Sequence, residues 1–262
     1  MTTRCTYLLV FILLACAHSV TAQTPLPNAH AHNDYEHARP LLDALEHGFC
    51  SVEADVWLVD GALLVAHDEE DVTPERTLEA LYLEPLAARV AANSGRVYPD
   101  GPEFILLVDS KSRPSTTYAA LVESLKRFES MLTTFSDDGE QAGAVRVIVS
   151  GGRPLRDMLA EEHHVAAYDG RIPDLDADYS SAFMPLVSAS FATAFPDAAV
   201  PLDETTKAEI RALTDAAHAK GRKFRFWATP EDERVWADLI ACGVDLINTD
   251  QLERLRAFLE SK

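Results

Sequence analysis

Residues 51–68 read SVEADVWLVDGALLVAHD, and this stretch decides the fold class. It begins with an apolar run in which Glu53 and Asp55 are two residues apart, so both carboxylates lie on one face of a strand. Asp60 and Gly61 favour a tight turn, and the apolar residues that follow predict a small hairpin. The stretch therefore indicates a buried strand that carries charged residues, extended by a hairpin that ends at His67 and Asp68.

Short apolar runs of this kind recur along the chain, and stretches with helical spacing separate most of them. The predicted strands are residues 27–32, 51–58, 104–109, 145–150, 165–169, 183–188, 223–228 and 245–248. The predicted helices are Ala38–Glu46, Thr116–Phe128, Leu155–Glu162, Thr205–Lys220 and Asp232–Ala241, three of them ended by Gly48, Gly221 and Gly243. Eight such units are typical of an α/β protein with a (β/α)8 TIM barrel, here as a single domain over residues 23–262. An open doubly wound sheet is the alternative, because periodicity does not show closure.

The composition excludes one class of partner. The chain has 42 Asp and Glu against 23 Lys and Arg, a formal net charge of -19. This charge would repel a phosphate backbone, so we expect no nucleic-acid partner.

Residues 1–22 have the pattern of a leader peptide. Arg4 precedes an apolar run over Tyr7–Ala17 that is too short to span a bilayer, and small residues precede Gln23. We expect a signal peptide and an exported protein, secreted or periplasmic. Leu13–Cys16 also resembles a lipoprotein cleavage box, so an envelope lipoprotein with peripheral or lipid-anchored membrane association is the alternative. We expect Cys50 and Cys242 to be free thiols rather than a disulfide.

Polar residues gather where the predicted strands end, which is where barrel enzymes carry their chemistry. Glu53 and Asp55 are joined by Asp109 at the end of the third predicted strand. Three carboxylates are oxygen ligands that suit Mg²⁺ or Ca²⁺. The alternative is an ion-pair layer inside the barrel, formed with Lys111 or an arginine.

Histidines occur beside these carboxylates. His30 and His32 end the first predicted strand, and the hairpin delivers His67 to the same end of the barrel. Histidines on the two sides of a phosphate are suited to acid and base catalysis. A rival interpretation makes His30 and His32 joint metal ligands, as in amidohydrolases. Such sites also need histidines from strands five and six, whereas His163 and His164 precede strand five.

This order of residues resembles the superfamily of glycerophosphodiester phosphodiesterases and phosphatidylinositol phospholipase C-like enzymes. The similarity runs from His30 through Glu53, Asp55, Asp60-Gly61 and His67-Asp68 to Asp109 and Lys111, and returns at residues 226–229 and 248–250. The opening His-Ala-His-Asn-Asp-Tyr at residues 30–35 is most similar to the branch that includes the altered-inheritance-of-mitochondria proteins.

The resemblance implies roles for individual residues. His30 and His67 would be the catalytic acid and base, while Glu53, Asp55 and Asp109 would hold one divalent cation, Mg²⁺ or Ca²⁺. The residues that it assigns to the substrate are His32, Asn33, Lys111, Trp227 and Asn248. His32 could alternatively be the counterpart of the superfamily's first histidine.

The predicted function is a metal-dependent phosphodiesterase that acts on a glycerophosphodiester or a phospholipid headgroup. The chain departs from the glycerophosphodiesterase pattern because it lacks the His-Arg-Gly and Glu-Asn-Thr sequences and has Asp109 where a glutamate is common. A barrel that binds a ligand or metal without turnover is therefore the alternative function.

Overall fold

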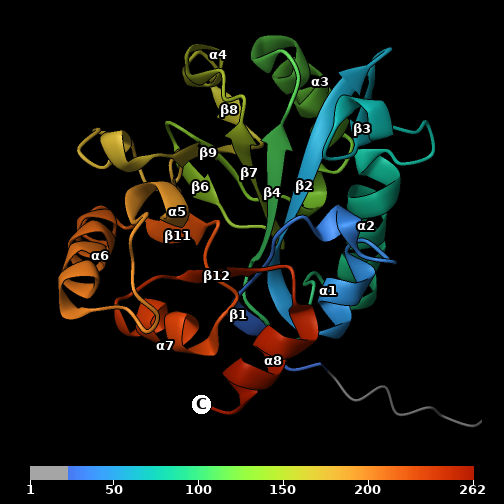
Figure 1. Ribbon diagram of the computed structural model, residues 1–262. Coiled ribbons are helices and arrows are strands. Elements are labelled where there is room, and N and C mark those ends of the chain that lie inside the picture. The colour runs from blue at the N-terminus through green and yellow to red at the C-terminus, as the bar shows by residue number, and fades with distance from the viewer. Residues whose placement is uncertain (1–22) are drawn as a thin grey trace, which may run out of the picture.

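The computed structural model describes residues 23–262, which form a closed barrel of eight parallel strands (Figure 1). Its strands in chain order are β1 (Leu26–Ala31), β2 (Phe49–Val59), β4 (Phe104–Ser110), β7 (Val145–Gly151), β9 (Ala167–Gly170), β10 (Leu186–Ser190), β11 (Lys223–Trp227) and β12 (Leu246–Thr249). The barrel closes because β1 pairs with both β12 and β2. The predicted (β/α)8 fold is confirmed, and the open sheet is excluded. The predicted leader lies outside the described residues.

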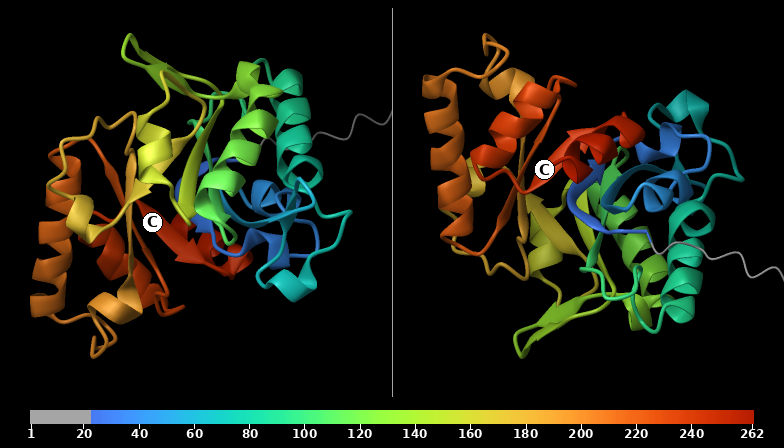
Figure 2. Two further views of the ribbon diagram at one scale, coloured as in Figure 1. Left: turned by 90° about the horizontal axis from the view of Figure 1, so that it is seen from above. Right: turned by 90° about the horizontal axis from the view of Figure 1, so that it is seen from below.

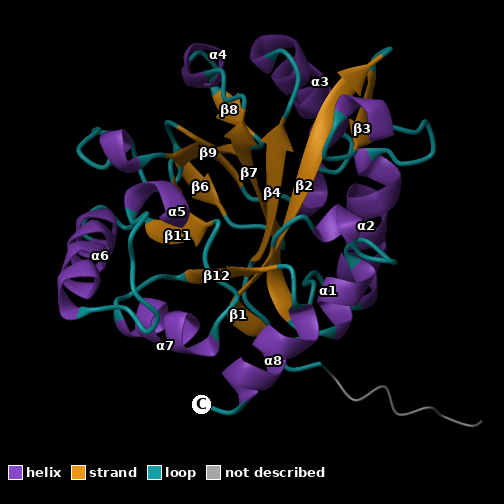
Figure 3. Cartoon of the chain, in the orientation of Figure 1, coloured by secondary structure: helices purple, strands orange, loops and turns teal. Residues whose placement is uncertain are grey.

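Helices surround the strands (Figures 2 and 3). They are α1 (Leu42–Glu46), α2 (Glu84–Ala92), α3 (Pro114–Lys126), α4 (Leu155–Leu159), α5 (Phe191–Ala194), α6 (Glu204–His218), α7 (Glu233–Ala241) and α8 (Leu252–Glu260). The last helix, α8, lies beside β1, so the two ends of the described chain meet at the bottom of the barrel (Figure 1). None of the helices in residues 23–262 is both long and apolar enough to cross a membrane.

Prolines explain two differences from the predicted boundaries. The first helix begins at Leu42 rather than Ala38, because Pro40 precedes it and Leu41 adopts a φ of 63° outside the helical region. The sixth barrel strand begins at Leu186, immediately after Pro185, which has no N–H to donate to a sheet. Helices α2, α5 and α8 were not predicted, and neither was the small sheet of β5 (Thr134–Ser136), β6 (Gly139–Gln141) and β8 (His163–His164).

The predicted hairpin is present as β2 and β3 (Ala62–Val65), which pair antiparallel with Val59 opposite Ala62. Asp60 and Gly61 form its two-residue turn with φ values of 48° and 85°. Positive φ at both turn positions matches the right-handed twist of the strands. The hairpin carries the chain over the end of the barrel and delivers His67 there.

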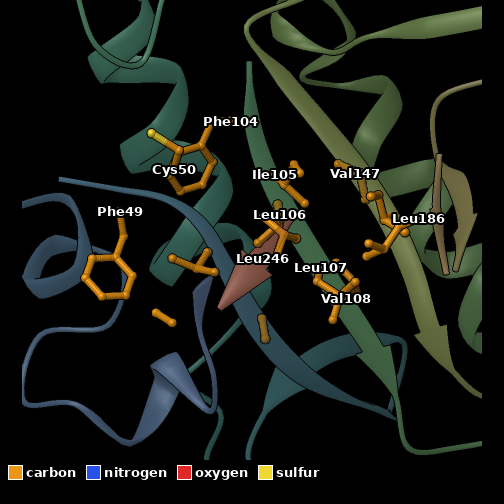
Figure 4. Close-up of a cluster of buried hydrophobic side chains, with 14 of the residues drawn as sticks. Phe49, Cys50, Phe104, Ile105, Leu106, Leu107, Val108, Val147, Leu186 and Leu246 are labelled. Atoms are coloured by element: carbon orange, nitrogen blue, oxygen red, sulfur yellow. The ribbon is translucent and has the colours of Figure 1, made fainter. Parts of the chain in front are cut away.

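The core forms on both sides of the central strands. Five consecutive residues of β4, Phe104–Val108, are buried, and they lie among side chains from neighbouring strands (Figure 4). A strand buried on both faces is what a parallel barrel with outer helices requires. Cys50 and Cys242 are buried free thiols, as predicted.

Candidate active site

A cavity of about 430 Å³ opens at the carboxyl ends of the barrel strands. Its wall consists of His32, Asn33, Glu53, His67, Asp109, Lys111, Ser150, Gly151, Arg171, Arg225, Trp227 and Ala228. Seven of the predicted site residues are among them. In the described part of the chain, His30, Asp55 and Asn248 lie behind this wall rather than on it.

The three predicted metal ligands converge at the cavity. Glu53, Asp55 and Asp109 each offer a carboxylate oxygen, and these oxygens all lie within 4.8 Å of one another. Sheet register produces this arrangement, because Asp55 of β2 is directly opposite Asp109 of β4. The Oδ1 atom of Asp55 is buried and has no hydrogen-bond partner in residues 23–262. An unpaired buried carboxylate oxygen beside two others fits a hard divalent cation.

The carboxylates of this acidic cluster differ in pKa. Burial, followed by the charge of Glu53, raises the pKa of Asp55 to about 6, and the same two causes raise the pKa of Asp109. Burial would also raise the pKa of Glu53, but the charge of Arg225 outweighs it and holds this pKa well below its usual range. Glu53 is therefore the permanently ionised member of the acidic cluster.

Lys111 lies within the acidic cluster. Its Nζ is 2.9 Å from Oδ2 of Asp55 and 3.0 Å from Oδ1 of Asp109. Burial would lower the pKa of Lys111, but the charges of these two carboxylates outweigh it and raise the pKa. The ion-pair layer considered from the sequence is thus present at the same place as the predicted metal ligands.

Arg225 is a site residue that the sequence analysis missed. It is buried in β11, and its Nη1 donates to Oε2 of Glu53 at 2.8 Å, to Nε2 of His30 at 2.5 Å and to Oδ1 of Asn248 at 3.3 Å. The available signal was a charged residue at the centre of Lys-Phe-Arg-Phe-Trp, where an unpaired guanidinium would be costly to bury. Asn248, a predicted substrate ligand, instead accepts from Arg225 beneath the wall.

His30, which the resemblance assigns to the catalytic pair, lies below the cavity rather than on its wall. Arg225 has only donors, so Nε2 of His30 is an acceptor, and its Nδ1–H donates to Oγ of Ser51 at 2.6 Å. Burial and the charge of Arg225 lower the pKa of His30 to about 4. Both nitrogens of this neutral ring are thus occupied by protein groups.

His32 occupies the wall position expected of a proton-transfer group. Its Nδ1 lies 2.8 Å from Oδ1 of Asp250, which leaves Nε2 for a ligand. Burial would lower the pKa of His32, but the hydrogen bond to Asp250 and the charge of Glu53 outweigh it and raise the pKa above 6.5. Asp250 is itself held by its backbone N–H, which donates to Glu231 at 2.9 Å.

His67 is held on the opposite rim by Tyr35. The Tyr35 hydroxyl lies 2.7 Å from Oδ2 of Asp55 and 2.9 Å from Oδ1 of Asn33, and Nδ1 of His67 lies 3.0 Å from the same oxygen. When Tyr35 donates to the carboxylate, its oxygen accepts from Nδ1–H of His67, so Nε2 of His67 is the free ring nitrogen. Trp227 is 39% exposed and completes the apolar part of the wall.

A second polar group lies at the ends of the neighbouring strands, and it too was missed. Asp169 is fully buried at the end of β9 and forms an ion pair with Arg171 at 2.6 Å. Ser150 and Ser188 donate to the two oxygens of Asp169 at 2.8 and 2.7 Å. The ends of the fifth and sixth barrel strands, β9 and β10, therefore supply an ion pair and a serine hydroxyl. His163 and His164 instead lie in β8, which pairs with β5 in the small sheet. This arrangement does not favour the amidohydrolase interpretation.

Comparison with known families agrees with the fold. Residues 18–169 match the AIM6-like phosphodiesterase domain, and residues 223–253 match the glycerophosphoryl diester phosphodiesterase family. The chain is 30% identical over 265 residues to the altered inheritance of mitochondria protein 6 homolog of Arthroderma benhamiae, covering 89% of this chain and 84% of that protein. It is 32% identical to the Lachancea thermotolerans protein of that name, covering 88% of this chain and 65% of that protein.

Solved structures with the same fold are glycerophosphodiester phosphodiesterases. The enzyme from Agrobacterium tumefaciens aligns with a TM-score of 0.53 at 16% identity, covering 90% of this chain and all of that chain (100%). The enzyme from Parabacteroides distasonis aligns with a TM-score of 0.51 at 18% identity, covering 91% and 98%. A phosphodiesterase from Oleispira antarctica, solved with the product sn-glycerol-3-phosphate, aligns with a TM-score of 0.51 at 16% identity, covering 90% and 97%. At these identities the similarity shows the fold.

Proposed function

The chain belongs to the AIM6-like phosphodiesterase family, and from that premise we propose that it is a metal-dependent phosphoric diester hydrolase with a two-histidine mechanism. One observation carries the proposal: His32 and His67 line the same cavity as Glu53 and Asp109, whose carboxylates converge with that of Asp55 behind the wall. Two proton-transfer groups beside a cation site are what cleavage of a phosphodiester requires.

The donor set fits one divalent cation, Mg²⁺ or Ca²⁺, because all three ligands are carboxylates and one buried oxygen is without a partner in residues 23–262. Glu53, Asp55 and Asp109 would hold it. When bound, the cation would neutralise negative charge on the phosphoryl oxygens. Lys111, which lies between two of these carboxylates, supplies a second positive charge for the same phosphoryl group.

We assign the base to His67 and the acid to His32. The base would take the proton from a substrate hydroxyl next to the phosphodiester, since Nε2 of His67 is its free nitrogen. That oxygen attacks phosphorus and the bond to the leaving oxygen breaks. His32, whose raised pKa favours its protonated form, donates a proton to the leaving oxygen. The products are an alcohol and a cyclic phosphate, which water opens later. His30 orients the groups beneath the cavity without touching substrate.

The family and the cavity together support a proposed substrate class. We propose a glycerophosphodiester or a phospholipid-headgroup phosphodiester. Trp227 and Asn33 on the wall would contact its alcohol parts. The sequence pattern of residues 1–22 supports the proposal that the protein is exported, either secreted or periplasmic or as an envelope lipoprotein.

A panel of phosphodiesters tests the proposed function. The purified protein is stripped with EDTA and then assayed after addition of Mg²⁺, Ca²⁺ or Zn²⁺, with hydrolysis followed by phosphorus NMR. We expect Mg²⁺ or Ca²⁺ to restore turnover, and His67→Ala to lower kcat by about 10²–10⁴-fold. His163→Ala is the matched control, because this exposed histidine contacts Glu129 outside the cavity.

Three results would count against the proposal. Recovery with Zn²⁺ alone would favour a histidine metal site, and full activity of His67→Ala would remove the two-histidine mechanism. No hydrolysis of any diester with any of these metals would favour the barrel that binds without turnover.

A further inference from the structure

The second polar group of the cavity is built to hold one guanidinium rigidly. Nη1 of Arg171 donates to Oδ2 of Asp169 at 2.6 Å and to the carbonyl of Gly170 at 2.9 Å, and Nη2 donates to Oγ of Ser150 at 3.1 Å. Asp169 cannot turn away, because Ser150 and Ser188 donate to its two oxygens. Arg153 also donates to the backbone carbonyl of Asp169. Arg171 is thus positioned before any ligand arrives, so binding loses little side-chain entropy.

Part of this guanidinium has no protein partner. Within residues 23–262, Nε–H of Arg171 has no hydrogen-bond partner, and Nη2, which carries two hydrogens, donates only to Oγ of Ser150. Nε–H and one N–H of Nη2 lie on the same edge of the planar group and are parallel. Two parallel donors match the two oxygens of a carboxylate or phosphoryl group. Arg171 is 28% exposed at its side chain and lines the cavity, so this edge is available to a ligand there.

The charge of the cavity wall agrees with an anionic ligand. The whole chain has a net charge of -19, yet the wall carries three cationic side chains, Lys111, Arg171 and Arg225, against two carboxylates, Glu53 and Asp109. Lys111 and Arg225 contact the acidic cluster, where the scissile phosphodiester is proposed to lie. Arg171 contacts none of the three metal ligands and is held at the ends of β7 and β9, which follow β4 in the barrel. Arg171 is therefore free to bind a part of the ligand other than the phosphoryl group at the acidic cluster.

We propose that Arg171 is a specificity-determining residue that binds a second two-oxygen anion, a carboxylate or a phosphoryl group, on the alcohol part of the substrate. The inference rests on the proposed phosphodiesterase function and narrows its substrate to diesters whose alcohol is acidic. Arg171 lies between the two family matches, which cover residues 18–169 and 223–253.

A matched pair of substrates tests the proposal. Glycerophosphoserine and glycerophosphoethanolamine differ by one carboxylate, so the ratio of their kcat/KM values isolates its recognition. We expect the metal-loaded wild-type protein to favour the serine diester about tenfold, as one charged two-donor contact allows. Arg171→Lys retains the positive charge against Asp169 but has no planar two-donor edge, and we expect its ratio to fall to about one. Arg127→Gln, an exposed arginine outside the cavity, should leave the ratio unchanged.

A binding measurement separates this proposal from the proposed function. Calorimetry with O-phosphoserine and phosphoethanolamine needs no turnover, and we expect about tenfold tighter binding of phosphoserine that Arg171→Lys abolishes. A binding difference without hydrolysis of any diester would contradict only the phosphodiesterase. Equal binding of the two ligands by the wild-type protein, or an equal loss of both in Arg171→Lys, would overturn the role of Arg171.

Discussion

The two sides of the cavity differ in how their charges are satisfied. On the side formed by β2 and β4, three carboxylates share Lys111 and Arg225, and one buried oxygen of Asp55 has no hydrogen-bond partner within the described residues. On the side formed by β7, β9 and β10, one carboxylate, Asp169, has a partner for each oxygen.

The two sides of the cavity are therefore suited to different tasks, one to the reaction at phosphorus and the other to the choice of substrate. A group of carboxylates with an unpaired oxygen gains free energy when a cation binds. A fully paired carboxylate gains nothing from a cation, but it fixes an arginine whose remaining donors are unpaired within residues 23–262. The acidic cluster is therefore suited to the reacting phosphoryl group, and the Arg171 side to the rest of the substrate.

The largest effect is expected from the histidines of the acidic side. His32→Gln should lower kcat by about 10²–10⁴-fold with an unchanged melting temperature, because His32 lies on the wall. His30→Gln should instead lower the free energy of unfolding by about 1–3 kcal/mol, since it breaks buried hydrogen bonds to Ser51 and Arg225. Kinetics and thermal unfolding of both variants check this. A stable but inactive His30→Gln beside an active His32→Gln would return the catalytic role to His30.

Acid should weaken metal binding on the acidic side. The folded-state pKa of Asp55 is raised to about 6 by burial and by Glu53, so below pH 6 a proton competes with the cation for this carboxylate. We expect the affinity for Mg²⁺ to fall about tenfold per pH unit below 6 and to level off above it. Calorimetric titration with Mg²⁺ between pH 5 and 8 measures this affinity, because that range spans the raised pKa of Asp55. A flat affinity profile would mean that Asp55 is not a ligand.

Gly151 connects the two sides, and its substitution should loosen the acidic cluster. Its φ is 62°, and an added Cβ would clash with Oδ1 of Asp109. Gly151→Ala should therefore displace Asp109. We expect Mg²⁺ to bind about tenfold more weakly, because a change beside a metal ligand commonly lowers metal affinity by about this factor. Gly95→Ala is the matched control, because Gly95 has a φ of 91° with nothing within 4 Å of the added Cβ. Equal metal affinity of the two variants would refute the contact.

The smallest effect concerns Asp250, which acts through His32. Its hydrogen bond helps to raise the pKa of His32, so Asp250→Asn should lower that pKa. As the proposed acid, His32 must be protonated, so activity is lost as pH rises through its pKa. The basic limb of the profile of kcat/KM should therefore move to lower pH in Asp250→Asn. Glu129→Gln, which contacts His163 outside the cavity, should not move it. A limb shifted to higher pH would contradict the assignment.

The sequence predicted the acidic side better than the Arg171 side. Glu53, Asp55 and His67 lie within one short stretch, where strand periodicity and a tight turn fix their relative positions. Which of His30 and His32 meets the cavity depends on depth along the barrel axis, and the alternation of side chains along a strand does not give depth. Arg225 pairs with Glu53 across the barrel interior, a contact that only closure creates. Arg171 follows the strand end at Asp169, and the paired serines come from two other strands.

The most direct test of the account is the position of the cation itself. Crystals of the protein soaked in Mn²⁺, a spectroscopically distinct substitute for Mg²⁺, would show it by anomalous scattering. We expect one anomalous peak in contact with Glu53, Asp55 and Asp109, and we expect it to be absent in Asp55→Asn. A peak on His30 and His32, or no peak at these three carboxylates, would contradict it.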